Sequence, residues 1–279
     1  MAKVKRMSKK MTAYEHEALD ALREWLAEPP SLATRWTGKA AGPAGRALQS
    51  AVPDVLLRAV LKGLDAAAEK LSGREALLRQ AGVTSPAQLR EAPLETCEAL
   101  AASVQKRAMA VAGGTGALLG IAGAAGLIAD VPTLVAQALR GIRRTALCYG
   151  EDANSTQARH FAVGVFALAS ATSMEEKSSA LEALRSGGIV IAHPGVSGGL
   201  ELAAQRELAK EAAVLSVTSI ARGVGHKLGW RRIAVGALPG VGALVGGSLN
   251  AWYLHDVIST ARYVCRERWL RANHPRLAV

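Results

Sequence analysis

Apolar residues recur at helical spacing along almost the whole chain, and capping signals divide these stripes into separate helices. Thr12 and Glu15 have the T-x-x-E spacing of a capping box, and the apolar residues after them share one face until Pro29-Pro30. Similar signals start two short helices near 72 and 85 and a longer one near 93. Further helices are predicted over 53–72, 131–149, 155–171, 173–185, 200–222, 233–250 and 252–272, with a kink at Pro239.

Two uncharged stretches of 22 residues, 108–129 and 233–254, stand out because they are rich in glycine and flanked by charge. The first contains six glycines and eight alanines, which add little free energy of transfer into a bilayer. Glycines one turn apart, such as Gly116 and Gly120 or Gly242 and Gly246, instead favour close approach of helices. The neighbour could be protein, lipid or each in turn, so an integral membrane hairpin remains an alternative.

Helical signals cover nearly everything else, and the segment Ile189–Ile191 is the only plausible strand. We therefore predict an all-α fold, a bundle-like arrangement of many helices with the two glycine-rich helices at its centre. Residues 12–273 form one domain, between a basic disordered tail at 1–11 and a short C-terminal tail at 274–279. Three cysteines without C-x-x-C spacing are expected to be reduced and buried.

The net charge of +11 lies at the two ends of the chain. Residues 1–11 carry +5 and residues 222–279 carry +7, while the remainder is close to neutral. Basic ends favour an anionic partner, and the apolar centre favours phospholipid over nucleic acid, for which no recognised module is present. The candidate contacts with an anionic surface are Lys3, Lys5, Arg6, Lys9, Lys10, Arg266, Arg268 and Arg271.

Three polar residues, Asp130, Asn250 and Asp256, lie in or beside the apolar stretches. An unpaired carboxylate there would be costly, so we expect Asp130 and Asp256 to pair with arginines such as Arg140 or Arg262. Asn250 would then bond to a neighbouring helix backbone. The functional alternative is a buried polar pocket, or a headgroup site, between the two glycine-lined helices.

One catalytic pattern is present, the G-x-S-x-G of residues 195–199 around Ser197. Asp256 and His274 follow in the chain order of the α/β-hydrolase triad, which makes a serine hydrolase the alternative function. A nucleophile elbow requires a multi-stranded sheet, and the rest of the chain reads as helix, so we favour a non-enzymatic protein. The scattered histidines match no metal-binding motif, and no phosphate-binding loop is present, so no cofactor is expected.

Several motifs along residues 14–271 match a known family in order and spacing. They are Tyr14, Glu15 and Trp25; Gly116, Gly120, Asp130 and Pro132; Arg140, Tyr149 and Gly150; Arg159 and Phe161; Pro239, Gly242, Gly246, Asn250, Asp256, Ala261, Arg262, Arg266, Arg268, Trp269 and Leu270. The chain resembles the EcsC family, bacterial proteins associated by gene neighbourhood with an ABC transporter. The resemblance implies a helical, cytoplasmic or membrane-peripheral protein without an established reaction.

Together these observations predict a protein that binds anionic lipid, or a membrane partner such as a transporter, at the inner face of a bacterial membrane. The N-terminus leads into a charged amphipathic helix rather than an apolar segment, so we expect no signal peptide and a cytoplasmic location.

Overall fold

The computed structural model describes residues 10–30, 73–121, 123–151, 156–171, 173–186, 234–275 and 277. The predicted strand at Ile189–Ile191, Ser197, and the predicted helices over 53–72 and 200–222 lie outside the described residues. So do residues 1–9 of the N-terminal tail.

All regular structure in the described residues is helical, which confirms the all-α prediction. The helices are α1 (Ala13–Ala27), α5 (Arg74–Ala81), α6 (Pro86–Glu91), α7 (Leu94–Ile121), α8 (Gly123–Cys148), α9 (Thr156–Ala169), α10 (Met174–Arg185) and α12 (Ala234–Asn273). Helix α1 begins at the predicted capping box, where Thr12 Oγ1 accepts a hydrogen bond from the Glu15 amide at 3.2 Å. The Glu15 carboxylate in turn accepts one from the Thr12 amide at 2.7 Å.

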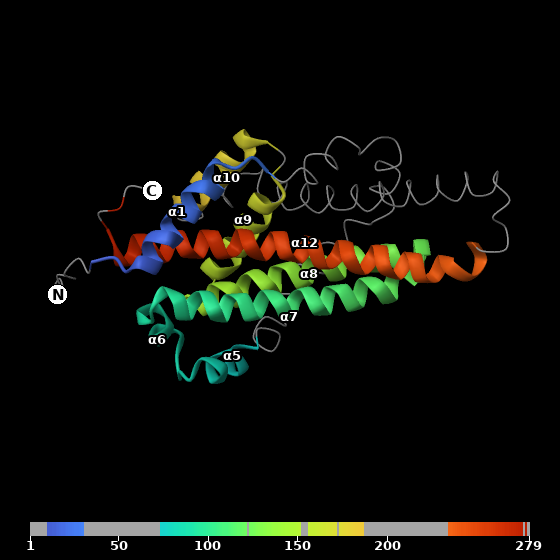
Figure 1. Cartoon of the computed structure of the whole chain (residues 1–279), viewed down its shortest axis with the longest axis horizontal. Helices are drawn as coiled ribbons and strands as arrows, with labels where there is room; N and C mark the ends of the chain where they lie inside the picture. Colours follow the sequence, from blue (N-terminus) through green and yellow to red (C-terminus); the bar gives the residue numbers. More distant parts are fainter. Residues whose placement is uncertain are drawn as a thin grey trace.

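Three long helices, α7, α8 and α12, lie side by side and form the axis of the molecule (Figure 1). Helix α12 packs along α7 and also contacts α8. Helices α1, α9 and α10 cover one side of this axis, and the short helices α5 and α6 lie on the other side, beside α7 (Figure 1). The end of the axis that holds the α7–α8 connection and the start of α12 contains the glycine-rich sequence.

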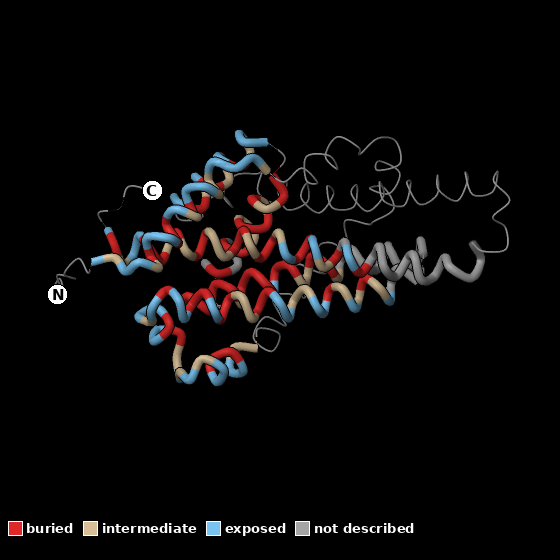
Figure 2. Tube along the Cα trace, in the orientation of Figure 1, coloured by how far each residue is buried: buried red, intermediate tan, exposed pale blue. Residues whose placement is uncertain are grey.

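The hydrophobic core lies where the short helices meet the axis (Figure 2). Each of the three long helices contributes side chains with almost no exposed surface, among them Leu94, Ile142 and Leu254, and α1 and α9 add Leu22 and Phe166. Leucine, valine and alanine supply most of this core, as the low aromatic content of the chain requires. Buried apolar surface of this kind provides most of the free energy that holds the helices together.

Two predicted helix boundaries are wrong, and both lie in the glycine-rich stretches. The helix predicted to start at residue 131 starts earlier, because α7 ends at Ile121 and α8 begins at Gly123 and continues through Pro132. The second predicted boundary, near residue 251, is absent, since α12 is continuous from Ala234 to Asn273. A proline inside a helix costs about 3 kcal/mol, so the position of Pro132 within α8 runs against the local signal for a helix start.

Glycine allows close helix approach where Gly247 of α12 meets Gly113 of α7. A Cβ atom on Gly247 of α12 would stand 2.7 Å from the carbonyl oxygen of Gly113 on α7 and 3.3 Å from Ala117 Cβ. The two backbones therefore touch without intervening side chains. This contact joins the two apolar stretches directly, an outcome that the sequence left open between protein and lipid neighbours.

Candidate functional site

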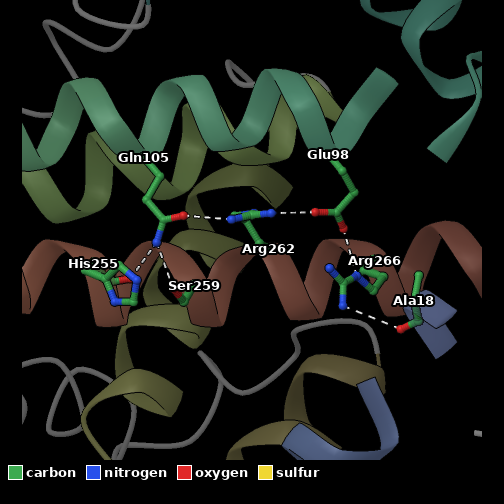
Figure 3. Close-up of polar contacts among 7 residues, drawn as sticks. All are labelled: Ala18, Glu98, Gln105, His255, Ser259, Arg262 and Arg266. Atoms are coloured by element: carbon green, nitrogen blue, oxygen red, sulfur yellow. Dashed lines mark hydrogen bonds and ion pairs between the residues drawn. The ribbon is translucent and has the colours of Figure 1, made fainter. Parts of the chain in front are cut away.

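A buried carboxylate, Glu98 of α7, lies at the centre of a polar cluster between α7 and α12 (Figure 3). Its Oε1 accepts a hydrogen bond from Arg266 Nε at 2.7 Å, and its Oε2 accepts one from Arg262 Nη2 at 2.7 Å. The two arginines lie four residues apart on α12, so both face the same carboxylate. Glu98 is 3% exposed, and the pairing therefore takes place away from bulk water.

The cluster continues along α7 through Gln105, two turns from Glu98. Gln105 Oε1 accepts a hydrogen bond from Arg262 Nη1 at 2.8 Å. The other end of the amide donates to Ser259 Oγ at 2.7 Å and to the His255 carbonyl at 3.0 Å. His255, Ser259, Arg262 and Arg266 form one stripe of α12, which makes the cluster a polar seam along the helix pair (Figure 3).

Electrostatics keep the Glu98 carboxylate ionised. Burial alone would raise its pKa, but the hydrogen bonds and charges of Arg266 and Arg262 outweigh burial and lower the pKa below its ordinary value of 4.5. Burial likewise opposes the charge of Arg266, yet pairing with Glu98 raises the pKa of that guanidinium. A carboxylate with both oxygens bonded to guanidinium groups is suited to joining helices rather than to transferring protons.

Residues 266–268 connect α12 to five other parts of the molecule: α1, α7, α9, α10 and Glu151 after α8. Besides its bonds to Glu98, Arg266 donates to the Ala18 carbonyl of α1 at 3.5 Å. Glu267, 3% exposed, accepts from Arg185 of α10 at 2.7 Å and pairs with Arg271 at 2.8 Å. Arg268 pairs with Glu151 at 2.8 Å and lies over the ring of Phe161 on α9.

A second cluster fixes the C-terminal end of α1. Lys177 of α10 donates to the carbonyls of Trp25 at 2.5 Å and Glu28 at 2.6 Å and lies over the Trp25 ring. The Trp25 ring stacks on Tyr263 of α12 with centroids 4.8 Å apart. A cation on the last carbonyls of a helix also complements its dipole. Helix α1 is thus held by both α10 and α12.

The model of the EcsC protein family matches residues 16–270, almost the whole chain. The chain belongs to the EcsC family. Comparison with curated proteins and with solved structures gave no match. In this EcsC protein the Arg-x-Arg-Trp-Leu motif of residues 266–270 lies at the junction of the helices.

The predicted polar site of this EcsC protein is not assembled as expected. Of its five residues, only Arg262 belongs to the buried seam, and its partners are Glu98 and Gln105 rather than Asp256. Asp256 lies six residues before Arg262 and about 120° away around α12, so the two side chains leave the helix in different directions. Asn250 is buried in α12, whereas Arg140 is exposed on α8. Asp130 lies within α8, and its side chain is outside the described part.

The predicted C-terminal contacts with an anionic surface are likewise different. Arg266, Arg268 and Arg271 pair with Glu98, Glu151 and Glu267, and the Arg266 side chain is only 12% exposed. Glu98 and Glu151 come from distant sequence, so a local charge count does not include them, whereas Glu267 lies within the motif and is counted there. Lys10 is exposed, as expected of a surface contact, while Lys3, Lys5, Arg6 and Lys9 lie outside the described residues.

The structure does not bring the predicted hydrolase partners together. Asp256 lies within α12, and His274 is the first residue after the C-terminal end of that helix. At a helical rise of 1.5 Å per residue, about 27 Å therefore separates Asp256 from His274 along the helix axis. His274 instead lies 3.3 Å from the Glu15 carboxylate of the α1 capping box. Ser197 lies outside the described residues.

The three cysteines, Cys97, Cys148 and Cys265, are free and buried, which confirms the expectation. Burial raises the pKa of Cys97 to about 11 and that of Cys148 to about 12. Among the described residues, no group of histidine, cysteine and acidic side chains could hold a metal ion. None of the described helices has a segment long and apolar enough to cross a membrane.

The residues that sequence reasoning missed are Glu98, Gln105, Glu151 and Glu267. One signal could have revealed the first two. Glu98 and Gln105 lie seven residues apart on a helix whose other inward positions, such as Leu94, Ala101 and Val104, are apolar and buried. Buried polar residues on an apolar helix face require hydrogen-bond partners. Arg262 and Arg266, which lie one turn apart on α12, are spaced so that they can supply those partners.

Proposed function

We propose that this EcsC protein is a non-enzymatic protein that associates peripherally with the anionic, cytoplasmic face of a bacterial inner membrane. The observation that carries the proposal is the outer face of α7. Arg107, Val111, Gly114 and Leu118 all lie on this face and are all exposed. Val111 is 57% and Leu118 70% exposed, in the glycine-rich half of the helix.

An exposed apolar strip next to basic residues suits the boundary between headgroups and acyl chains. Lys106 and Arg107 are exposed where the strip begins, and long cationic side chains can extend to headgroups while neighbouring apolar groups reach deeper. Trp252 of α12 is 36% exposed, and its neighbour Ala251 lies against Gly113 of α7, at the level of Val111. Tryptophan is enriched at membrane interfaces, which supports the same assignment.

The charge available for membrane attraction comes mainly from the N-terminal run and from α7. Lys3, Lys5, Arg6, Lys9 and Lys10 precede the first helix without any acidic residue. Each lysine or arginine near an anionic surface contributes about 1 kcal/mol. Arg266 and Arg268 are assigned no part in lipid contact, because their ion pairs hold the helices together.

Vesicle flotation tests the proposal with the full-length protein. Wild type should float with phosphatidylglycerol-containing vesicles, float less with phosphatidylcholine alone, and lose binding as salt rises. The double variant Val111→Glu/Leu118→Glu should bind roughly tenfold more weakly, since two apolar contacts become repelled charges. Deleting residues 1–9 should weaken binding to anionic vesicles further.

The matched control is Met174→Glu, which places the same charge on an exposed apolar residue of α10. This variant should float like wild type, or show only the small effect of one added charge. Equal binding by wild type and the α7 double variant contradicts the proposal. Because the vesicles contain no protein, binding to them also distinguishes lipid from a membrane-protein partner such as a transporter.

A further inference from the structure

Three arginines from α7 and α8 converge on the side of the bundle that faces α5. Arg140 and Arg144 are one turn apart on α8 and therefore share a face. The hydrogen bond between Gln137 Nε2 and Thr115 Oγ1, 3.2 Å long, sets the register of α7 against α8. In this antiparallel register, Arg107 of α7 lies level with Arg144 of α8.

Within the described residues, these arginines differ from those of the Glu98 cluster because no carboxylate is placed against them. In the part of the chain that the structure describes, no carboxylate pairs with Arg107, Arg140 or Arg144. The Nε of Arg144 is buried without a hydrogen-bond partner. Burial, followed by the charges of Arg140 and Arg107, lowers the pKa of Arg144. Arg140 and Arg107 thus both act electrostatically on Arg144, which lies one turn from Arg140 and level with Arg107.

The N-terminal turn of α5 adds further positive potential at the same place. The Arg144 guanidinium carbon lies 3.6 Å from where a Cβ atom of Gly73, the N-cap residue of α5, would stand. No side chain caps this helix end. The nearest acidic residue in sequence, Glu75, is 89% exposed and lies 4.0 Å from Arg79. Arg144 therefore adjoins the positive end of a helix dipole.

We propose that Arg107, Arg140 and Arg144, beside the N-terminal turn of α5, bind a phosphate monoester group. Like charges held together in a folded protein are unfavourable unless an anion neutralises them. A phosphate monoester carries a charge of about −1.5 to −2 and accepts paired hydrogen bonds from guanidinium groups, so it matches three arginines better than one carboxylate does. The site does not require membrane association and goes beyond the function proposed above.

Thermal unfolding of the full-length protein in chloride and in inorganic phosphate, at equal ionic strength and pH, tests the site directly. Phosphate at about ten times its dissociation constant should raise the Tm of wild type by about 2–4 °C. Arg140→Gln should lose most of this increase, and Arg140→Gln/Arg144→Gln should lose all of it. In chloride, Arg140→Gln should be at least as stable as wild type, because the substitution removes repulsion.

The control is Arg23→Gln, which makes the same change in net charge on α1, where the side chain is 55% exposed. It should retain the full response to phosphate. An equal response in Arg23→Gln and Arg140→Gln overturns the proposal, as does the lack of any response in wild type. A loss of stability in Arg140→Gln that is the same in both salts also overturns it, since this result means a structural role.

A second experiment, with lipid vesicles, identifies whether the phosphate group comes from a lipid headgroup or from a free compound. Phosphatidylcholine vesicles containing phosphatidic acid are compared with vesicles of equal surface charge containing phosphatidylserine. A preference for phosphatidic acid that disappears in Arg140→Gln/Arg144→Gln identifies a lipid headgroup, whereas a phosphate response without this preference identifies a free phosphate compound. Failure of membrane binding remains separate, because Leu118→Glu alone, three turns from Arg107 on α7, should weaken vesicle binding and keep its thermal response to phosphate.

Discussion

At the scale of single residues, Gly150 shows how strictly one backbone position can be determined. It follows α8 with φ of +81°, a conformation that side chains with a Cβ atom rarely adopt. A Cβ atom there would also lie 2.4 Å from the backbone nitrogen of Arg90 and 2.7 Å from the Pro86 carbonyl oxygen, both in α6. The Gly150 carbonyl in turn accepts a hydrogen bond from Arg90 Nη2 at 3.0 Å. Glycine at this position lets α6 pack on the end of α8.

Replacing Gly150 by alanine should therefore lower the free energy of unfolding by more than about 2 kcal/mol, since left-handed strain alone costs about 1–2 kcal/mol and the contact with α6 adds to it. Chemical denaturation measures the change. The matched control is Gly82→Ala, at φ of +67° with no atom within 4 Å of the added Cβ. The control should show only the left-handed strain. Equal effects at the two positions would contradict the steric argument.

At the scale of elements, the contact between α7 and α12 depends on glycine at particular positions. The Gly247 backbone lies against the Gly113 carbonyl, while Gly114, one residue further along α7, faces open space. Other glycines have flexible neighbours. A Cβ atom on Gly141 would meet the end of the Ile258 side chain at 2.8 Å, which can move more easily than a backbone atom. The glycine-rich composition thus combines positions that require glycine with positions that do not.

Gly247→Ala and Gly114→Ala should consequently have opposite effects on stability. Alanine favours a helix over glycine by about 0.5–1 kcal/mol, so Gly114→Ala should raise the Tm. Gly247→Ala receives the same benefit but forces α7 and α12 apart, and overpacking of this kind typically costs about 1–3 kcal/mol. A Tm above that of wild type for Gly247→Ala would mean that the two helices are not in close contact. Thermal unfolding monitored by circular dichroism gives both values.

At the scale of the whole molecule, ion pairs join helices from distant parts of the sequence, and two of these sets are centred on a buried carboxylate. Glu98 joins α7 to α12, Glu267 joins α12 to α10, and Arg268 joins α12 to Glu151 after α8. An apolar core alone tolerates several helix registers, whereas a buried carboxylate between two guanidinium groups tolerates few. Removing one partner of such a set costs about 3–5 kcal/mol because it leaves buried charge without compensation.

The Glu98 cluster should also make global stability sensitive to acid. The pKa of Glu98 is lower in the folded protein than its ordinary value of 4.5, so its contribution is present above that value and is lost as the pH falls through the folded pKa. Glu98→Gln should reduce the free energy of unfolding by about 3–5 kcal/mol at pH 7 and flatten its decline below pH 4.5. Denaturation curves over a range of pH measure both effects.

The control for this experiment is Glu95→Gln, which changes an exposed carboxylate in the first turn of the same helix. It should cost no more than about 1 kcal/mol, the usual value for a helix-dipole interaction. An acid profile of Glu98→Gln that runs parallel to wild type would contradict the assignment of the pH dependence to Glu98.

The local features of this chain follow from its sequence. The capping box at Thr12 and Glu15, the helices that begin near residues 74 and 86, and the burial of the three cysteines were all predicted correctly. Helical periodicity and caps act within a few residues, so the neighbouring sequence suffices to specify them. The family assignment likewise came from order and spacing of motifs along the chain.

Tertiary structure alone decided where the long helices end and which charges meet. Pro132 and Pro239 both lie inside helices, although proline in a helix interior carries a local cost. Arg266 reaches Glu98 across 168 positions of sequence, and a count of local charge assigns it to the surface instead. The sequence determines how many arginines the chain carries, but only the fold determines which of them find a carboxylate. Long-range pairing depends on helix register, and register is set by the packing of side chains that lie far apart in the chain.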